Sequence, residues 1–210
     1  MRVGKRKIVS PHRVLLQPFR IPLWVKKIEA FFILRSYSKF WTFFVVCFVL
    51  DVATKSWVVE NAHALLHNPI VVFDWLDGSE AFFEITYVTN PGAAWSMFSD
   101  YPEILTILAF VALMSVFLFR RNLELKKSPN QWMLGLICGG ILGNLSDRLF
   151  REPAEVVDFI DIFLPVINYD YPIFNVADSS IFLGAIFYFF HSLKEAKLEQ
   201  GLDRQDTTSD

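Results

Sequence analysis

The chain has 210 residues, 53% of them hydrophobic, including 22 phenylalanines. Its formal net charge is −2 and its mean hydropathy is +0.36. A soluble domain of this length needs less apolar surface, so the composition predicts a membrane protein and argues against a soluble enzyme. The two cysteines, Cys47 and Cys138, lie in separate apolar runs. This placement predicts buried thiols rather than a disulfide or a metal site.

Four apolar runs follow one another along the chain. They cover residues 41–59, 104–119, 132–145 and 173–193. Each approaches the roughly 20 residues that a helix needs to cross a bilayer, and none shows the two-residue alternation of a barrel strand. The predicted fold class is therefore an all-α membrane protein, built as a bundle of four transmembrane helices.

The distribution of basic residues predicts how this bundle is oriented across the membrane. Ten Lys and Arg residues precede Trp41, more lie in the connection 120–127 and in the C-terminal tail, and none lies between Lys55 and Arg120. Because positively charged segments stay on the cytoplasmic side, both termini are expected inside. The connections after the first and third helices then face outward, and the second of these, 148–172, is expected to be a loop.

The first outer connection, 60–101, is long for a simple link between helices. Residues 70–73 and 82–88 within it are rich in β-branched and aromatic side chains, and Asp77-Gly78 between them suits a turn. We therefore expect a small extracytoplasmic β-sheet on the outer face of the bundle.

The chain divides into three expected parts. A basic cytoplasmic extension, 1–40, precedes the four-helix membrane domain, 41–195, and a solvated tail, 196–210, follows it. The extension could lie on the inner membrane surface or be disordered, and nothing in it indicates chemistry. Residues 62–64, Ala-His-Ala, are typical of a signal-peptide cleavage site, but the basic leader before them is too long for a signal peptide.

Polar residues recur at helical spacing inside the apolar runs. Asp51 and Lys55 are four apart in acid-first order, which predicts an internal ion pair that ties the first helix to its neighbours. Near the outer end of the third helix, Asn144, Asp147 and Arg148 share one face. The start of the fourth helix repeats this pattern with Asn175, Asp178 and Ser179, preceded by Pro172 as a helix start signal.

Three carboxylates are expected near the outer interface: Asp147, Asp158 and Asp178. Asp147 has Arg148 beside it and Arg151 one turn on, so it is interpreted as a partnered structural charge. Asp158 and Asp178 have no basic neighbour in sequence, and two carboxylates brought together tend to share one proton. Such a pair can act as general acid and base on a water molecule, which predicts an aspartate dyad.

Other chemistry lacks residues at suitable spacing. The four histidines are scattered and no nucleophile motif is present. A metal site built from the three aspartates is an alternative, but no His or Cys accompanies them at ligand spacing, so neither a metal nor a cofactor is expected. An ion-coupled carrier is an alternative, because intramembrane acids also suit proton or cation transport. The clustering of the acids at one face and the lack of a visible inverted repeat count against a carrier. An inactive assembly scaffold is a third interpretation.

Five short motifs follow one another along residues 40–195. They are Asp51-Val-Ala-Thr-Lys55, Asn90-Pro-Gly92-Ala-Ala-Trp95-Ser, Gly143-Asn144-Leu-Ser-Asp147-Arg148, Val156-Val-Asp158-Phe159 and Phe174-Asn175-Val-Ala-Asp178-Ser179. In this order and spacing they resemble bacterial lipoprotein signal peptidase (signal peptidase II), although each motif alone would be weak. The sequence departs from the family at Trp95, where Phe is common, and in the leader before Trp41, which has no counterpart in the usual short member.

The resemblance implies a membrane aspartic endopeptidase that removes the signal peptide from prolipoproteins, cutting before the diacylglyceryl-modified cysteine. Asp158 and Asp178 match the family's catalytic dyad. The family's supporting polar residues match Asp51, Asn90, Gly92, Asn144, Asp147, Arg148 and Asn175. The expected partners are lipid-modified precursors and membrane lipid, without nucleic acid, and the expected state is a monomer. The expected location is the bacterial cytoplasmic (inner) membrane, with several crossings and the active site at the outer face.

Overall fold

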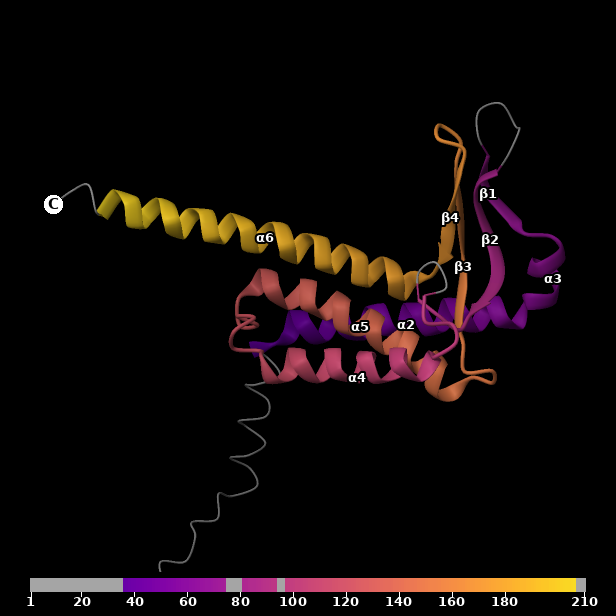
Figure 1. Ribbon diagram of the computed structural model, residues 1–210, viewed down its shortest axis with the longest axis horizontal. Helices are drawn as coiled ribbons and strands as arrows, with labels where there is room; N and C mark the ends of the chain where they lie inside the picture. The colour runs from indigo at the N-terminus through magenta and orange to yellow at the C-terminus, as the bar shows by residue number, and fades with distance from the viewer. Residues whose placement is uncertain (1–35, 75–80, 94–96, 207–210) are drawn as a thin grey trace, which may run out of the picture. The chain divides into compact units, whose positions relative to one another are not determined.

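The computed structural model describes residues 36–74, 81–93 and 97–206 of the chain (Figure 1). Within 201–206 it describes the backbone alone. Most of the expected basic extension, the Asp77-Gly78 turn and the unusual Trp95 lie outside the described residues. The expected boundaries of the membrane domain stay predictions.

Four long helices correspond to the four apolar runs. They are α2 (Ser38–Glu60), α4 (Pro102–Leu118), α5 (Ser128–Phe150) and α6 (Val176–Asp206). Helix α5 packs against α2, α4 and α6, so it is the central helix of the bundle (Figure 1). The prediction of four helices is confirmed at these positions.

Two of these helices are long and apolar enough to cross a membrane. They are α2 and the part of α6 from Val176 to Gln200, while α4 is a shorter apolar helix. Large apolar side chains on α2 and α4, such as Val49 and Phe110, are about half exposed, which suits contact with lipid rather than water. The number of four crossings stays a prediction.

Glycines allow α5 to approach its neighbours closely. A Cβ atom added at Gly139 would lie 2.6 Å from the Phe44 carbonyl oxygen and 3.0 Å from Cys47 Cβ. A Cβ atom at Gly135 would lie 2.6 Å from the Phe40 carbonyl oxygen. The α5 and α2 backbones are therefore in direct contact, as small residues permit in membrane bundles.

A four-stranded antiparallel sheet lies at one end of the bundle (Figure 1). Its order is β1-β2-β3-β4. The strands are β1 (Ile70–Asp74), β2 (Ala81–Asn90), β3 (Val156–Leu164) and β4 (Tyr169–Phe174), and the short helix α3 (Ala62–His67) precedes β1. The small sheet predicted in the first outer connection is thus present as β1 and β2, and the second outer connection adds β3 and β4 to it.

The prediction that 148–172 is a loop was wrong. Its sequence Val-Val-Asp-Phe-Ile-Asp-Ile-Phe-Leu is rich in β-branched and aromatic residues, which favour an extended strand, and it pairs with β2 on one side and β4 on the other. The fold is therefore mixed rather than all-α. Pro172 does not start the last helix: it lies in β4, an edge strand that tolerates proline, and α6 begins at Val176.

A small apolar core joins the sheet to the helices. It consists of Val58 of α2, Leu65 of α3, and Val157 and Phe159 of β3, all buried. Val157 and Phe159 flank Asp158 in sequence, so the side chains on either side of it anchor β3 to the bundle. The position of Asp158 is therefore fixed by this core.

Gly139→Ala should destabilise the protein by about 1–3 kcal/mol, the usual cost of overpacking, because the new methyl group would press on the Phe44 carbonyl. Thermal unfolding in detergent measures the effect. Ser192→Ala, at an exposed position of α6, is the control and should leave the melting temperature nearly unchanged. Equal melting temperatures for the two variants would contradict the close contact between α2 and α5.

Candidate active site

Asp158 lies in the buried first half of β3, with 3% of its surface exposed. Its Oδ1 accepts a hydrogen bond from Asn175 Nδ2 at 2.7 Å, and its Oδ2 accepts one from Asn90 Nδ2 at 3.1 Å. Asn90 is the last residue of β2, which pairs with β3. Both carboxyl oxygens are therefore held by side-chain amides that come from other elements.

Asp178 lies in the first turn of α6 and takes part in a reciprocal cap. The Asn175 side-chain oxygen accepts a hydrogen bond from the Asp178 backbone N–H at 2.9 Å, and Asp178 Oδ2 accepts one from the Asn175 backbone N–H at 3.3 Å. This is the geometry of a capping box, in which residues three apart satisfy each other's backbone donors. The Asn-x-x-Asp spacing seen in the sequence thus builds the start of α6.

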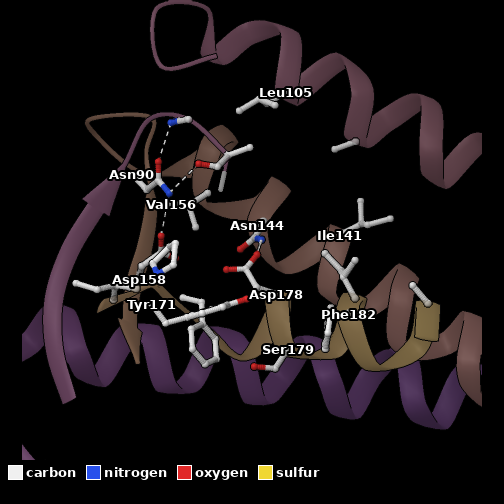
Figure 2. Close-up of a pocket in the computed structure, with 18 of the residues that line it drawn as sticks. Asn90, Leu105, Ile141, Asn144, Val156, Asp158, Tyr171, Asp178, Ser179 and Phe182 are labelled. Carbon is white, nitrogen blue, oxygen red and sulfur yellow. Dashed lines mark hydrogen bonds between the residues drawn. The ribbon is translucent and has the colours of Figure 1, made fainter. Parts of the chain in front are cut away.

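Two side-chain amides connect the two aspartates: half-buried Asn144 and buried Asn175. Asn144 Nδ2 donates to Asp178 Oδ1 at 2.7 Å (Figure 2). Asn175, which donates to Asp158, also donates to Asn144 Oδ1 at 3.1 Å and is fully buried. The hydrogen-bonded path from Asp158 through Asn175 and Asn144 to Asp178 brings the two residues into one site, as the sequence predicted.

Burial raises the pKa of Asp158 to about 7, with a smaller contribution from the negative charge of Asp178. The hydrogen bonds from Asn90 and Asn175 oppose this rise, because they stabilise the charged carboxylate. Near neutral pH, Asp158 can therefore hold a proton while a second carboxyl group lies beside it. This is the condition that an acid/base pair requires.

Lys55 is fully buried beneath these amides. Its Nζ lies 2.8 Å from Asp51 Oδ2, 2.9 Å from Asp147 Oδ2 and 2.8 Å from Asn144 Oδ1. The predicted Asp51–Lys55 pair is present, but Lys55 also binds Asp147 and Asn144, which the sequence did not indicate. Asp51 Oδ1 in turn accepts the backbone N–H of Ala177, so the same network holds the first turn of α6.

Asp147 has partners on three elements. It forms ion pairs with Arg151 and with Lys55, and its Oδ2 accepts the backbone N–H of Val157 at 3.3 Å. The predicted structural charge is thus present. Arg148, its neighbour in sequence, is not its partner in the structure: the Arg148 guanidinium donates to the Gly92 carbonyl at 2.8 Å.

The segment after β2 is folded over the site by local hydrogen bonds. The Asn90 side-chain oxygen accepts the Gly92 N–H at 2.9 Å, which forms a turn stabilised by a side chain. Arg148 holds the Gly92 carbonyl from the other side. Asn90, Gly92 and Arg148, three residues that the sequence assigned to the site, therefore lie together with the aspartates.

Asp158 and Asp178 both border a cavity of about 1020 Å³ (Figure 2). Most of its wall is apolar and comes from α4, α5, α6 and β4. These side chains include Leu105, Leu108, Ala112, Ile141, Pro172, Ile173, Phe182 and Ala185. Among the residues that the structure describes, neither aspartate forms an ion pair, and no cluster of three potential metal ligands occurs. A mostly apolar cavity that two carboxyl groups border can hold an apolar chain with a peptide bond beside a water molecule.

Comparisons with known proteins agree with this arrangement. Residues 43–194 match the family model described as "Signal peptidase (SPase) II". A lipoprotein signal peptidase of Shewanella sp. (strain MR-4) is 36% identical over 168 residues, which cover 74% of this chain and 86% of that protein. One from Anoxybacillus flavithermus (strain DSM 21510 / WK1) is 31% identical over 166 residues, covering 79% and 92%.

A solved bacterial membrane enzyme has a similar structure, with a TM-score of 0.59 and 30% identity over 74% of this chain and 87% of that one. A second such structure has a TM-score of 0.54 at 30% identity, covering 73% and 91%. Together with the two long apolar helices, these neighbours indicate a membrane location. The matches favour a peptidase over the carrier and the scaffold.

Lys55→Met should destabilise the protein by about 3–5 kcal/mol, because it leaves Asp51 and Asp147 buried without their shared cation. Thermal unfolding in detergent measures the loss. The matched control is Lys127→Met, since Lys127 forms ion pairs in a far more exposed setting and its removal should change the melting temperature little. If both variants melted at the same temperature, the buried network would not carry the stability assigned to it.

Proposed function

The chain belongs to the signal peptidase II family, and we propose that it removes the signal peptide from lipid-modified prolipoproteins, cutting before the diacylglyceryl-modified cysteine. The observation that carries this proposal is the pair Asp158 and Asp178, linked through Asn144 and Asn175 and bordering a mostly apolar cavity. In this proposal four helices cross the bacterial inner membrane, both termini are cytoplasmic, and the sheet lies at the outer face.

The cavity suits a substrate that is itself anchored in the membrane. Its wall between α4 and α6 carries Leu108, Ala112, Phe182 and Ala185, which would contact the apolar signal helix or the lipid chains of the precursor. Anchoring in the bilayer restricts the scissile bond to the depth of the aspartates. Positioning of this kind can supply a large part of the rate enhancement.

We assign the proton of the resting pair to Asp158 and the negative charge to Asp178. The pKa of Asp158 is raised to about 7, and the N-terminus of α6 interacts favourably with a negative charge at its third residue. A water molecule between the two would lose a proton to Asp178 as its oxygen attacks the peptide carbonyl carbon. Asp158 would donate its proton to the carbonyl oxygen at the same time.

The second half of the reaction restores both groups. As the C–N bond breaks, Asp178 would pass its proton to the leaving nitrogen, which becomes the amino group of the modified cysteine. The proton on the former carbonyl oxygen would return to Asp158. Atoms and charges balance without a covalent enzyme intermediate and without a cofactor.

The remaining site residues would either position the two aspartates or contact the substrate backbone. In this proposal Asn144 and Asn175 orient the carboxyl groups, while Asp51 and Asp147 hold Lys55 beneath them. Asn90, Gly92 and Arg148 form the rim that would contact the peptide next to the scissile bond.

Asp158→Asn and Asp178→Asn should each lower cleavage of a diacylglyceryl-modified precursor by about a hundredfold or more, because each removes one half of the acid/base pair. Production of the shortened lipoprotein by purified enzyme is the measurement. Asp161→Asn is the matched control: this residue lies in the same strand, pairs across to Glu84 and does not line the cavity. Near-normal processing by Asp158→Asn would contradict the assignment of Asp158 to the catalytic pair.

The rate constant kcat/KM should fall as the pH rises through about 7, because Asp158 then loses its proton and both carboxyl groups are charged. Asn90→Ala should move this fall to higher pH. The Asn90 amide stabilises the charged form of Asp158, so its loss raises the pKa further. A full pH profile of each enzyme checks the sign, and a fall displaced to lower pH in Asn90→Ala would contradict it.

A further inference from the structure

A second cavity, of about 540 Å³, lies at the opposite end of the bundle from the sheet, where α4 connects to α5 and α2 begins (Figure 1). Its lining includes Arg120, Arg121, Lys126 and Lys127, together with Tyr37 and Glu124. We call this cavity the basic recess. Its volume falls within the range of about 300–1,000 Å³ that small-molecule sites occupy.

The recess carries a net positive charge. Glu124 is paired with Lys127 at 2.8 Å, and Lys127 also binds Glu195 at 3.1 Å. Arg121 and Lys126 form no ion pair with any acid among the described residues. Arg120 donates to the Phe117 carbonyl, which leaves its charge uncompensated. Three cationic groups therefore remain to bind an anion.

Packing and hydrogen bonds hold the backbone around the recess, so its wall is not a loose surface loop. Leu125 is buried, and its backbone N–H donates to the Arg120 carbonyl at 3.0 Å. The buried Gln131 side chain donates to the carbonyl of Ser36 at 2.8 Å, which ties the connection to the start of α2. The positions of the basic residues are therefore set by packed neighbours.

An apolar surface adjoins the recess. Phe117 and Leu118 at the end of α4, and the C-cap residue Phe119, are 56–63% exposed. Helix α4 packs chiefly against α5, so its other sides face outward. A ligand with an anionic head and long apolar chains would satisfy both surfaces at once. Basic pockets at the ends of membrane helices bind lipid headgroups in this way.

We infer that the basic recess binds the phosphate headgroup of an anionic phospholipid whose acyl chains lie along α4. The inference goes beyond the peptidase activity, because the recess lies at the far end of the bundle from Asp158 and Asp178. Electrostatic attraction to the three cations distinguishes an anionic headgroup from a zwitterionic one. The apolar surface of α4 distinguishes a lipid from phosphate in solution.

Native mass spectrometry of the full chain in detergent, with equal amounts of dioleoyl phosphatidylglycerol and dioleoyl phosphatidylcholine, tests this inference. The wild type should retain phosphatidylglycerol preferentially. Arg121→Gln with Lys126→Gln should weaken that retention by about tenfold or more. The matched control is Lys194→Gln with Lys197→Gln, which removes the same charge from exposed positions of α6 and should retain the lipid. Both double variants keep the basic N-terminal residues, whose contribution cancels in the comparison.

Thermal unfolding supplies a second measurement. Phosphatidylglycerol should raise the melting temperature of the wild type and of the control more than that of the Arg121/Lys126 variant, while all three should melt alike without lipid. Equal loss of lipid from both double variants, or no preference for phosphatidylglycerol in the wild type, would overturn the inference. Displacement of the lipid by millimolar inorganic phosphate would also overturn it, because the recess would then recognise phosphate from solution.

Discussion

The buried ammonium group of Lys55 decides how the polar groups around the two aspartates are oriented. A buried cation must be fully solvated by acceptors, and here these are Asp51, Asp147 and Asn144. Because Asn144 turns its oxygen toward Lys55, only its NH₂ group is left to face Asp178. The buried charge of Lys55 thus determines which group of Asn144 faces Asp178.

The same network couples the helices to the sheet. Asp51 on α2 accepts the backbone N–H of Ala177 at the start of α6, and Asp147 on α5 accepts that of Val157 in β3. Asp158 and Asp178 therefore stand on two elements that are both tied to Lys55. Since interactions within one buried network are not independent, a change at any member should be felt at both aspartates.

The parts of this site that depend on residues close together in the sequence could be predicted. The parts that depend on contacts between distant segments could not. The Asn-x-x-Asp spacing on α6 gives a capping box, and Asp51 with Lys55 gives an ion pair, because helical geometry alone brings such residues together. The strands β3 and β4 were missed although the β3 sequence favours a strand, because β4 pairs with β3, and β3 pairs with β2, which ends more than 60 residues earlier. The contact of Arg148 with Gly92 and the contacts of Lys55 with Asp147 and Asn144 are likewise long-range.

The use of amides rather than cations as the side-chain hydrogen-bond partners of the two aspartates has a consequence for their chemistry. An ion pair with Asp158 would lower its pKa strongly and remove the proton that an acid/base pair needs. Asn90 and Asn175 fix the carboxyl group while they offset only part of the rise caused by burial. Lys55 lowers the pKa of Asp158 less than the two amides do, and it is connected to Asp158 only through Asn144 and Asn175. The positive charge is thus close enough to order the site and too far to fix the protonation of Asp158.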